Sequence, residues 1–415
     1  MKKSLLYYIL HPDHLLVVLF TLLLMRFIVF IALDISFLNP IERSLENFNM
    51  TDVFYDIYRQ GEVNDTSDLI TIVDIADVSK RGELADIITE LDMMEPAVLG
   101  VDIIFNRIRE DSAGNAMLLS AVRNVSTPTV WAKKLDKWDD NNGEFTDDIR
   151  SFFADSLSIN EGYINIHNDQ HGEAVRYFGT QRQLLGKTEY SMPLKVAMEL
   201  NGDSSLFNYT DDINIRYTKT TFPVVPYNEL AENYDLISGH IVLLGSKSDP
   251  RDQSFTPLGL IPGVEILAYT IQTITERKMP EEWSSKSILL LTILLMWLVQ
   301  VIRYLMCQLM FNSQQRWVRD FGECDFAGTL LNIMVVFVLV GFSFYHFVHN
   351  NVYINMAWAI AGIAMLEFSR KLYFLLISSL CYGLKIKFLR HSLAHDNWEE
   401  RQPYFKQIHR EQISK

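Results

Sequence analysis

The chain has 415 residues, in which 51 acidic residues outnumber 37 lysines and arginines and give a net charge of −14. This acidity argues against nucleic acid as a partner, because its phosphates require a basic protein surface. The three cysteines, Cys307, Cys324 and Cys381, all lie in the last third of the chain. We therefore expect neither a disulfide framework nor a thiolate metal site in the long polar region that precedes them.

Four apolar runs predict membrane-spanning helices, one near the start of the chain and three near its end. They cover residues 15–33, 286–305, 327–346 and 352–369. Each run, with its flanks, is close to the roughly 17–25 residues that a spanning helix needs. The first run has a long apolar core and no small-residue cleavage site, so we expect a signal anchor that is retained.

Basic residues predict the orientation of these spans, because lysines and arginines near spans stay in the cytoplasm. All the basic clusters next to the spans fall on one side: Lys2, Lys3, Arg303, Arg316, Arg319, Arg370, Lys371, Lys385, Lys387 and Arg390. We therefore expect residues 1–14 and 370–415 in the cytoplasm and residues 35–284 outside it. The lipid bilayer is then the first partner of the chain.

The region 35–284 has the pattern of one α/β domain. Short β-branched runs predict strands at residues 69–75, 98–105, 128–132, 162–166, 213–217 and 240–245. Apolar periodicity predicts helices at residues 80–94, 112–123, 191–200, 226–234 and 263–277. Strands that are apolar at nearly every position indicate a mostly parallel sheet flanked by helices. The acidic stretch 136–148 is the expected long loop.

Two aspartates mark the edge of this predicted sheet. Asp74 and Asp102 lie near the carboxyl ends of two neighbouring strands, where open α/β sheets bind ligands. Ser246, Asp252 and Thr256 follow the last predicted strand and could line the same crevice. The alternative is structural, since aspartate and serine also cap turns and helices.

We expect no catalytic centre, metal or cofactor. His167 and His171 are four residues apart in a predicted loop, where that spacing does not align side chains for a metal. His391 and His395 have helical spacing but lack the sequence context of a phosphoacceptor helix. No G-x-S-x-G nucleophile motif is present, and the outer region has no cysteine. These features predict a protein that is not an enzyme.

Among the polar residues within the predicted spans we single out Arg26, Asn332 and Glu367. A charge at the bilayer centre is unfavourable by roughly 2.5–3.5 kcal/mol, so Arg26 needs compensation. Asn332, Glu367, a lipid headgroup or an acidic residue of a partner could supply it. Our hypothesis is that Arg26 fixes the packing of the first span against the other three.

The segment after the last span has two interpretations. Residues 372–389 are apolar but short and bracketed by basic residues, so they form either a fifth span or a helix along the inner membrane surface. We expect the second, because too few uninterrupted apolar residues are present to cross a bilayer. Residues 370–415 would then be a cytoplasmic amphipathic helix and tail.

Several segments together resemble the CHASE2 domain, an extracytoplasmic sensory module of bacterial membrane receptors. They are ITIVDIADVSKRGELADIITELDMMEPAVLGVDIIF, GYINIHNDQHGEAVRYF, YSMPLKVAMEL, INIRYTKTTFPVVPYNEL and HIVLLGSKSDPRDQSFTPLGLIPGVEILAYTI. The resemblance covers roughly residues 40–280 and extends to the membrane layout of one span before the domain and three after it. It implies a multi-pass sensor in the bacterial inner (plasma) membrane that binds an extracytoplasmic ligand.

The resemblance also implies a signalling output. Such receptors are commonly fused to cyclases or kinases, whereas about 45 residues follow the fourth predicted span here. We therefore expect a cytoplasmic output protein that acts in trans, and a homo-oligomer is compatible with this layout. The alternative is a structural or accessory subunit of a cell-envelope complex, whose outer domain binds protein.

Overall fold

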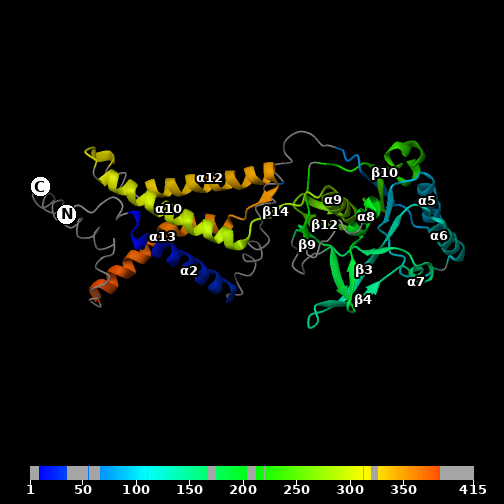
Figure 1. The fold of residues 1–415 in the computed structure, drawn as a ribbon, viewed down its shortest axis with the longest axis horizontal. Helices are drawn as coiled ribbons and strands as arrows, with labels where there is room; N and C mark the ends of the chain where they lie inside the picture. The colour runs from blue at the N-terminus through cyan, green and yellow to red at the C-terminus, as the bar shows by residue number, and fades with distance from the viewer. Residues whose placement is uncertain are drawn as a thin grey trace, which may run out of the picture. The chain divides into compact units, whose positions relative to one another are not determined.

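The chain folds into two compact units (Figure 1). The computed structural model describes residues 9–34, 55, 66–109, 111–166, 174–202, 212–218, 220–311, 313–318 and 326–383. Residues 47–281 form the first unit, here called the α/β unit. Residues 1–46 together with 282–415 form the second, here called the helical unit.

A parallel sheet forms the centre of the α/β unit, as predicted. Its strand order is β10-β1-β11-β2-β3-β5, and every neighbouring pair in this row is parallel. β11 lies between β1 and β2, although it follows both by more than a hundred residues. The strands are β10 (Val224–Pro226), β1 (Ile70–Asp74), β11 (Ile241–Gly245), β2 (Val98–Val101), β3 (Thr129–Asp139) and β5 (Glu161–Tyr163).

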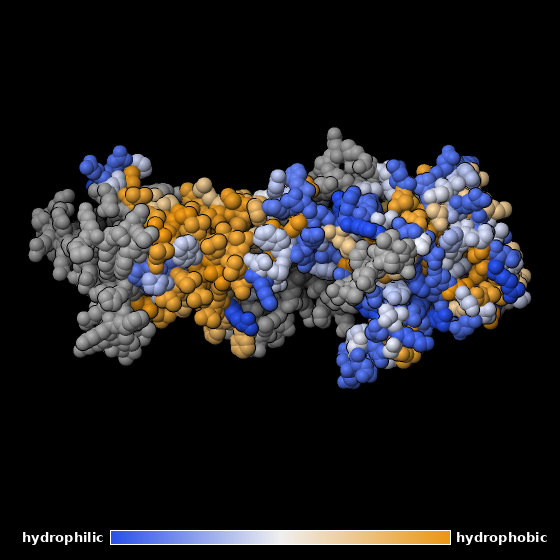
Figure 2. Space-filling model, viewed as in Figure 1, coloured by the Kyte–Doolittle hydropathy of each residue, from blue (hydrophilic) through white to orange (hydrophobic). Residues whose placement is uncertain are grey.

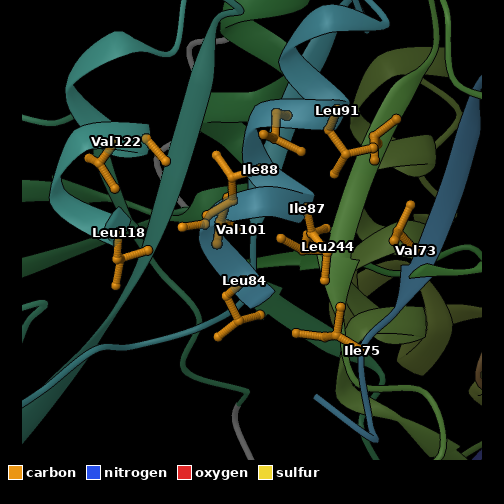
Figure 3. Close-up of a cluster of buried hydrophobic side chains, with 14 of the residues drawn as sticks. Val73, Ile75, Leu84, Ile87, Ile88, Leu91, Val101, Leu118, Val122 and Leu244 are labelled. Carbon is orange, nitrogen blue, oxygen red and sulfur yellow. The ribbon is translucent and has the colours of Figure 1, made fainter. Parts of the chain in front are cut away.

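Helices α5 (Arg81–Met93) and α6 (Ser112–Asn124) cover one face of this sheet. Their apolar side chains pack against alternate residues of the strands, as Figure 3 shows for Ile88 and Leu118 beside Val101. These side chains are almost fully removed from solvent. Burial of this kind contributes about 25 cal/mol per Å² of apolar surface, so this layer is a main source of stability.

Helices α8 (Met192–Asn201) and α9 (Gly263–Glu276) cover the opposite face. Small residues let them approach the strands closely. A Cβ on Gly100 would lie 2.9 Å from the Met192 Cε atom, and one on Gly245 would lie 2.9 Å from the Val264 Cγ2 atom. The sheet is therefore covered on both faces, which explains why its strands read as continuous apolar runs.

Local sequence signals define the ends of these helices. The carboxylate of Asp111 accepts a hydrogen bond from the Gly114 N–H (2.9 Å) and caps α6. Pro193 lies in the first turn of α8, where its missing N–H is not needed. Gly202 ends the same helix in a left-handed conformation with φ +65°.

The stretch 136–148 is a β-hairpin, so its prediction as a loop was wrong. β3 continues to Asp139, and β4 (Glu144–Ile149) pairs with it in antiparallel fashion. Cross-strand contacts offset the low strand propensity of the acidic residues, since the rings of Trp138 and Phe145 are 5.0 Å apart and Lys137 binds Asp147 at 2.5 Å. β7 (Gln181–Leu184) and β8 (Lys187–Tyr190) extend the sheet beyond β4.

Two other expected elements also differ. Residues 226–234 form the 3-10 turns η3 (Tyr227–Glu229) and η4 (Ala231–Leu236) instead of an α-helix, and neither turn has a buried side chain to hold a longer helix. The strand expected at 213–217 is β9 (Asp212–Asn214), which pairs with β6 (Tyr177–Gly179) outside the main sheet. The remaining elements are α7 (Ala154–Leu157), the hairpin β12 (Gln253–Thr256) and β13 (Gly259–Pro262), and β14 (Glu281–Glu282).

The described part of the helical unit contains four long helices. They are α2 (Pro12–Asp34), α10 (Ser285–Phe311), α12 (Phe326–Asn350) and α13 (Ala357–Gly383). α13 packs against each of the other three, and its Ile363 is buried with Val18 of α2 and Met296 of α10. Between α12 and α13 lies β15 (Val352–Tyr353), whose Tyr353 carbonyl accepts a hydrogen bond from the Trp283 N–H (3.2 Å).

Two of the described helices are long and apolar enough to cross a membrane, over residues Ser285–Met306 and Ala327–Asn350. Figure 2 shows the apolar surface that the helical unit presents. The structure thus gives two candidate spans where the sequence predicted four. α2 and α13 are helical at the predicted positions, but every eighteen-residue stretch of α13 includes Glu367, Arg370 and Lys371.

The helix α13 is unbroken from residue 357 to residue 383. A fifth span would require the chain to reverse between residues 369 and 372, and the described residues show no such turn. The described part of segment 372–389 is therefore a continuation of α13. Residues 384–389 lie outside the described part of the chain.

Replacement of Gly162 by alanine tests the close approach of α8 to the sheet. A Cβ on Gly162 would lie 2.5 Å from the Met192 Cα atom, so backbone would have to move. We expect Gly162→Ala to lower the free energy of unfolding of the α/β unit by about 1–3 kcal/mol. Thermal unfolding of the full chain, followed by tryptophan fluorescence, measures the change. Gly82→Ala is the matched control, because its Cβ would make an ordinary 3.5 Å contact with Met117 in a helix. An equal effect of both variants would contradict the close-packing account.

Candidate ligand site at the carboxyl edge of the sheet

Three adjacent strands end in a row of residues at the carboxyl edge of the sheet. Asp74 of β1 pairs with Gly245 of β11, and Asp102 follows the last residue of β2 on the other side of β11. The Asp102 Cβ atom is 3.3 Å from the position that a Cβ on Gly245 would occupy. Gly245 lies between the two aspartates that the sequence predicted, and Val264 of α9 fills the space beside it.

The connections around this row leave in opposite directions. The chain after β1 and β2 leads to α5 and α6, whereas the chain after β11 leads through the β12–β13 hairpin to α9 on the other face. In α/β proteins, ligands bind at the carboxyl ends of the strands where neighbouring connections diverge in this way. The structure places Asp74 and Asp102 on either side of Gly245 at this edge.

The carboxylate of Asp74 is engaged in local structure. It accepts hydrogen bonds from the backbone N–H groups of Ala76 (3.1 Å) and Lys247 (2.9 Å) and from the Ser248 hydroxyl (2.7 Å). These bonds tie the turn after β1 to the loop after β11. The structural alternative therefore describes Asp74 best.

Two more candidates also have structural partners. The Ser246 hydroxyl accepts a hydrogen bond from the Asp249 N–H (3.2 Å) within its own loop. The Thr256 hydroxyl donates to the Gly259 carbonyl (2.9 Å) and accepts from the Leu258 N–H (3.1 Å), which closes the β12–β13 hairpin. Thr256 is fully buried. Neither hydroxyl is positioned as a ligand group.

Asp102 differs from the other candidates. Its side chain is half-buried, and no side-chain hydrogen bond to it occurs among the described residues. Burial, with a smaller contribution from the negative charge of Asp252, raises the pKa of this carboxyl to about 7. A carboxyl in this state has unused hydrogen-bonding capacity and changes its charge near neutral pH.

Asp252 lies at the start of α9, beside this edge. Its carboxylate oxygens are 3.0 and 3.2 Å from the position of a Cβ on Gly263, so the glycine makes room for them. Burial and the negative charge of Asp249 raise the pKa of Asp252. Lys247 and Glu265 form an ion pair nearby in the chain, with 3.7 Å between Nζ and Oε2. Polar groups from both the loop and α9 therefore border the row.

A second group of charged residues lies around β5, and sequence reasoning missed it. Lys133 and Glu161 are both about 95% buried. Lys133 binds Glu189 (2.8 Å) and Asp148 (3.4 Å), and Glu161 binds Arg150. Burial raises the pKa of Glu161 despite the lowering effect of the guanidinium beside it. These pairs join β3, β4, β5 and β8, so their role is to hold the hairpin extension to the parallel sheet.

Metal binding has no support among the described residues, where no group of three or more histidines, cysteines, aspartates or glutamates could hold an ion. The four histidines considered from the sequence, His167, His171, His391 and His395, lie outside the described part of the chain.

In the helical unit, Glu367 of α13 pairs with Arg303 of α10 and, at 3.3 Å, with Arg370 of its own helix. Arg303 is buried, and its guanidinium lies where a side chain on Gly328 of α12 would be. The amide of Asn332 donates a hydrogen bond to the Ile363 carbonyl (3.2 Å). Polar contacts therefore connect α10, α12 and α13.

Arg26 lies elsewhere. Its side chain is exposed on α2, and it has no ion-pair partner among the residues that the structure describes. This differs from our hypothesis that Arg26 fixes the packing of the first span, because the side chains of α2 that pack against the other helices, such as Val18 and Met25, are buried whereas Arg26 is exposed. The charge that holds the helices together is Arg303.

Replacement of Asp102 by asparagine should change how stability depends on pH. Its pKa is about 7 in the folded state against 3.8 ordinarily, so between these values the folded state binds more protons than the unfolded state. Stability due to this group is therefore present at low pH and lost as pH rises through that window. We expect Asp102→Asn to have the same melting temperature as the wild type at pH 4. At pH 8 we expect its free energy of unfolding to be higher than that of the wild type by roughly 2 kcal/mol. The exposed Asp77→Asn is the control, and a pH-independent difference between Asp102→Asn and the wild type would contradict the assignment.

Removal of the Glu367 carboxylate should destabilise the helical unit. Glu367→Gln leaves the buried Arg303 without its counter-charge, a loss of about 3–5 kcal/mol for buried pairs. We expect the double variant Arg303→Met with Glu367→Met to regain most of this loss, since no charge is then buried. Thermal loss of helical circular dichroism in detergent is the measurement, with the exposed Glu281→Gln as control. A double variant less stable than either single variant would contradict this account.

The family of the chain follows from comparison with known proteins. The CHASE2 domain profile matches residues 19–302, which is more than half of the chain. This range includes the whole α/β unit, with the row of Asp74, Gly245 and Asp102, and reaches into α2 and α10. No curated protein and no solved structure matches the chain. CHASE2 domains are extracytoplasmic sensory domains, and the chain belongs to this family.

Proposed function

We propose that this protein is a sensor in the bacterial inner membrane, whose α/β unit binds a small ligand outside the cytoplasm and whose helical unit passes the signal inward. Membership of a family of sensory domains supports the first part. Two helices able to cross a membrane support the second. The full arrangement has four spans and both termini in the cytoplasm, in agreement with the distribution of lysines and arginines.

The ligand site of the sensor is the carboxyl edge of the parallel sheet. The observation that carries this proposal is the half-buried carboxyl of Asp102, which has no side-chain hydrogen bond among the described residues while its neighbours do. A polar side chain in a crevice without a protein partner is available to a ligand. Because Asp102 and Asp252 are both acidic, the ligand class is a small molecule with an amine or another cationic hydrogen-bond donor.

The route of the signal follows the chain. α10 begins at Ser285, directly after the α/β unit, and its Arg303 binds Glu367 on α13. α13 then continues for sixteen residues to Gly383. A shift of α10 would therefore act on α13 through a buried ion pair, and the end of α13 would present the change to an output protein in the cytoplasm. The ligand shifts this equilibrium only by its differential affinity for the two states.

This function needs no catalysis. Among the described residues, the candidate site holds carboxylates that act as hydrogen-bond acceptors, and no nucleophile with an adjacent base accompanies them. The protein is accordingly proposed to act as a receptor without enzymatic activity, and no cofactor is required.

A second candidate function is a protein-binding subunit of an envelope complex. One observation favours it: Phe255 and Leu260 lie directly opposite each other in the β12–β13 hairpin and are 54% and 66% exposed. Exposed apolar pairs of this kind are typical of protein contacts. The hairpin follows the loop of Ser246 and Asp252, so a protein bound there would contact the same edge of the sheet.

The ligand proposal is tested with the full chain in detergent and a panel of small amines, with putrescine and agmatine as first probes. A ligand that binds the folded state raises the melting temperature in proportion to the logarithm of its concentration. We expect a saturable increase in the wild type and an affinity at least tenfold weaker in Asp102→Asn. The control is Asp77→Asn, which removes the same charge from an exposed position of the same unit. An amine that stabilises Asp102→Asn as well as the wild type would place the site elsewhere.

A further inference from the structure

One side of α2 carries a regular row of exposed residues. Leu16, Leu19, Leu23, Arg26 and Phe30 are spaced alternately three and four residues apart and are all exposed. We call this row the α2 seam. An alternating three–four spacing is the pattern by which one helix packs along another, and a single polar residue within it fixes the partner and the register.

The α2 seam faces away from the other helices of the helical unit. The buried residues of α2 include Val17, Val18, Thr21 and Met25, and α2 packs against α13 and α10. The exposed leucines and phenylalanine of the seam are 42–67% exposed. The helical unit is therefore complete without the seam.

Arg26 lies near the middle of the apolar run. Residues 15–33 are centred on Leu24, so a rise of about 1.5 Å per residue puts Arg26 about 3 Å from the centre of the run. Both ends of the run are then about 10 Å or more away. The Cα–Cβ bond of a helical residue also tilts toward the helix N-terminus, which is the longer way out. A lipid headgroup is thus a poor partner for this guanidinium.

No acidic side chain among the described residues pairs with Arg26. Glu367 is the only aspartate or glutamate in the four apolar runs, and it pairs with Arg303 and Arg370. A second copy of the chain offers the same paired Glu367. Two copies joined seam to seam would bring Arg26 against Arg26, which is unfavourable in a medium of low dielectric constant.

We propose that the α2 seam binds a transmembrane helix of a different protein, which carries an aspartate or glutamate near the bilayer centre opposite Arg26. Charge complementarity determines this partner, because an arginine at this depth needs an opposite charge. Polar pairs between membrane helices also add to packing as a source of association. The inference rests on the proposed passage of α2 through the membrane and identifies the contact through which the sensor assembles with a partner.

The test places a photo-cross-linking amino acid at Leu23 of the full chain in its native membrane. We expect a covalent adduct with one protein, whose cross-linked peptide is a transmembrane segment with an aspartate or glutamate. Arg26→Leu should reduce the adduct at least tenfold, and Arg26→Lys should retain it. Arg26→Asp should lose it, and replacement of the partner's acidic residue by lysine should restore it in that variant. The same cross-linker at the buried Val18 is the matched control and should give no adduct with another protein.

Three results would overturn the proposal: adducts with lipid alone, adducts with a second copy of this chain, or a protein adduct that Arg26→Leu leaves unchanged. A membrane-impermeant maleimide applied to Asp140→Cys, an exposed position of the β3–β4 turn, separates this failure from that of the proposed topology. Labelling from outside without a protein adduct rejects the α2 contact alone. Absence of labelling rejects the topology and, with it, this inference.

Discussion

The insertion of β11 between β1 and β2 is the constraint on which the α/β unit depends. β1 and β2 are joined by α5, and only a strand from far along the chain completes their pairing. Before β11 enters, the backbone groups of both strands lack partners on their inner edges, which is unfavourable in a buried sheet. The last part of the domain must therefore fold onto the first, and the carboxyl edge forms only when it does.

This topology explains why a glycine lies between two aspartates. Gly245 ends β11 and is covered by Val264 of α9, so a side chain there would displace the helix. Asp74 on one side is satisfied by the loop that β11 brings, whereas Asp102 on the other side gains only the charge of Asp252. The same strand thus completes one aspartate's hydrogen bonds and leaves the other carboxyl unsatisfied.

Much of this could be predicted from the sequence, and the rest could not for physical reasons. Buried strands and their flanking helices are recognisable because burial on both faces demands apolar residues at nearly every position. The hairpin of β3 and β4 was missed because residues 136–148 are poor strand formers, and only contacts such as Trp138 with Phe145 hold them in a sheet. The sequence also could not predict that, among the described residues, the Asp74 carboxylate is hydrogen-bonded and the Asp102 carboxylate is not, since both lie at the end of a strand. Only the position of the loop after β11 determines which aspartate receives its hydrogen bonds.

The two charges that the sequence marked in the helical unit, Arg26 and Glu367, show the same limit. Each is a single charged residue in an apolar run, and a pair between them was one of the expected solutions. In the structure, Glu367 instead forms an ion pair with Arg303 of α10. In the sequence, Arg303 had served only to predict the orientation of the spans. Gly328 leaves the space for that guanidinium. Because Glu367 is paired with Arg303, Arg26 has no acidic partner within the described helices. Arg26 is exposed on α2. A charged side chain within the bilayer is energetically unfavourable. A counter-charge for Arg26 that the described helices do not supply therefore has to come from the surroundings of α2.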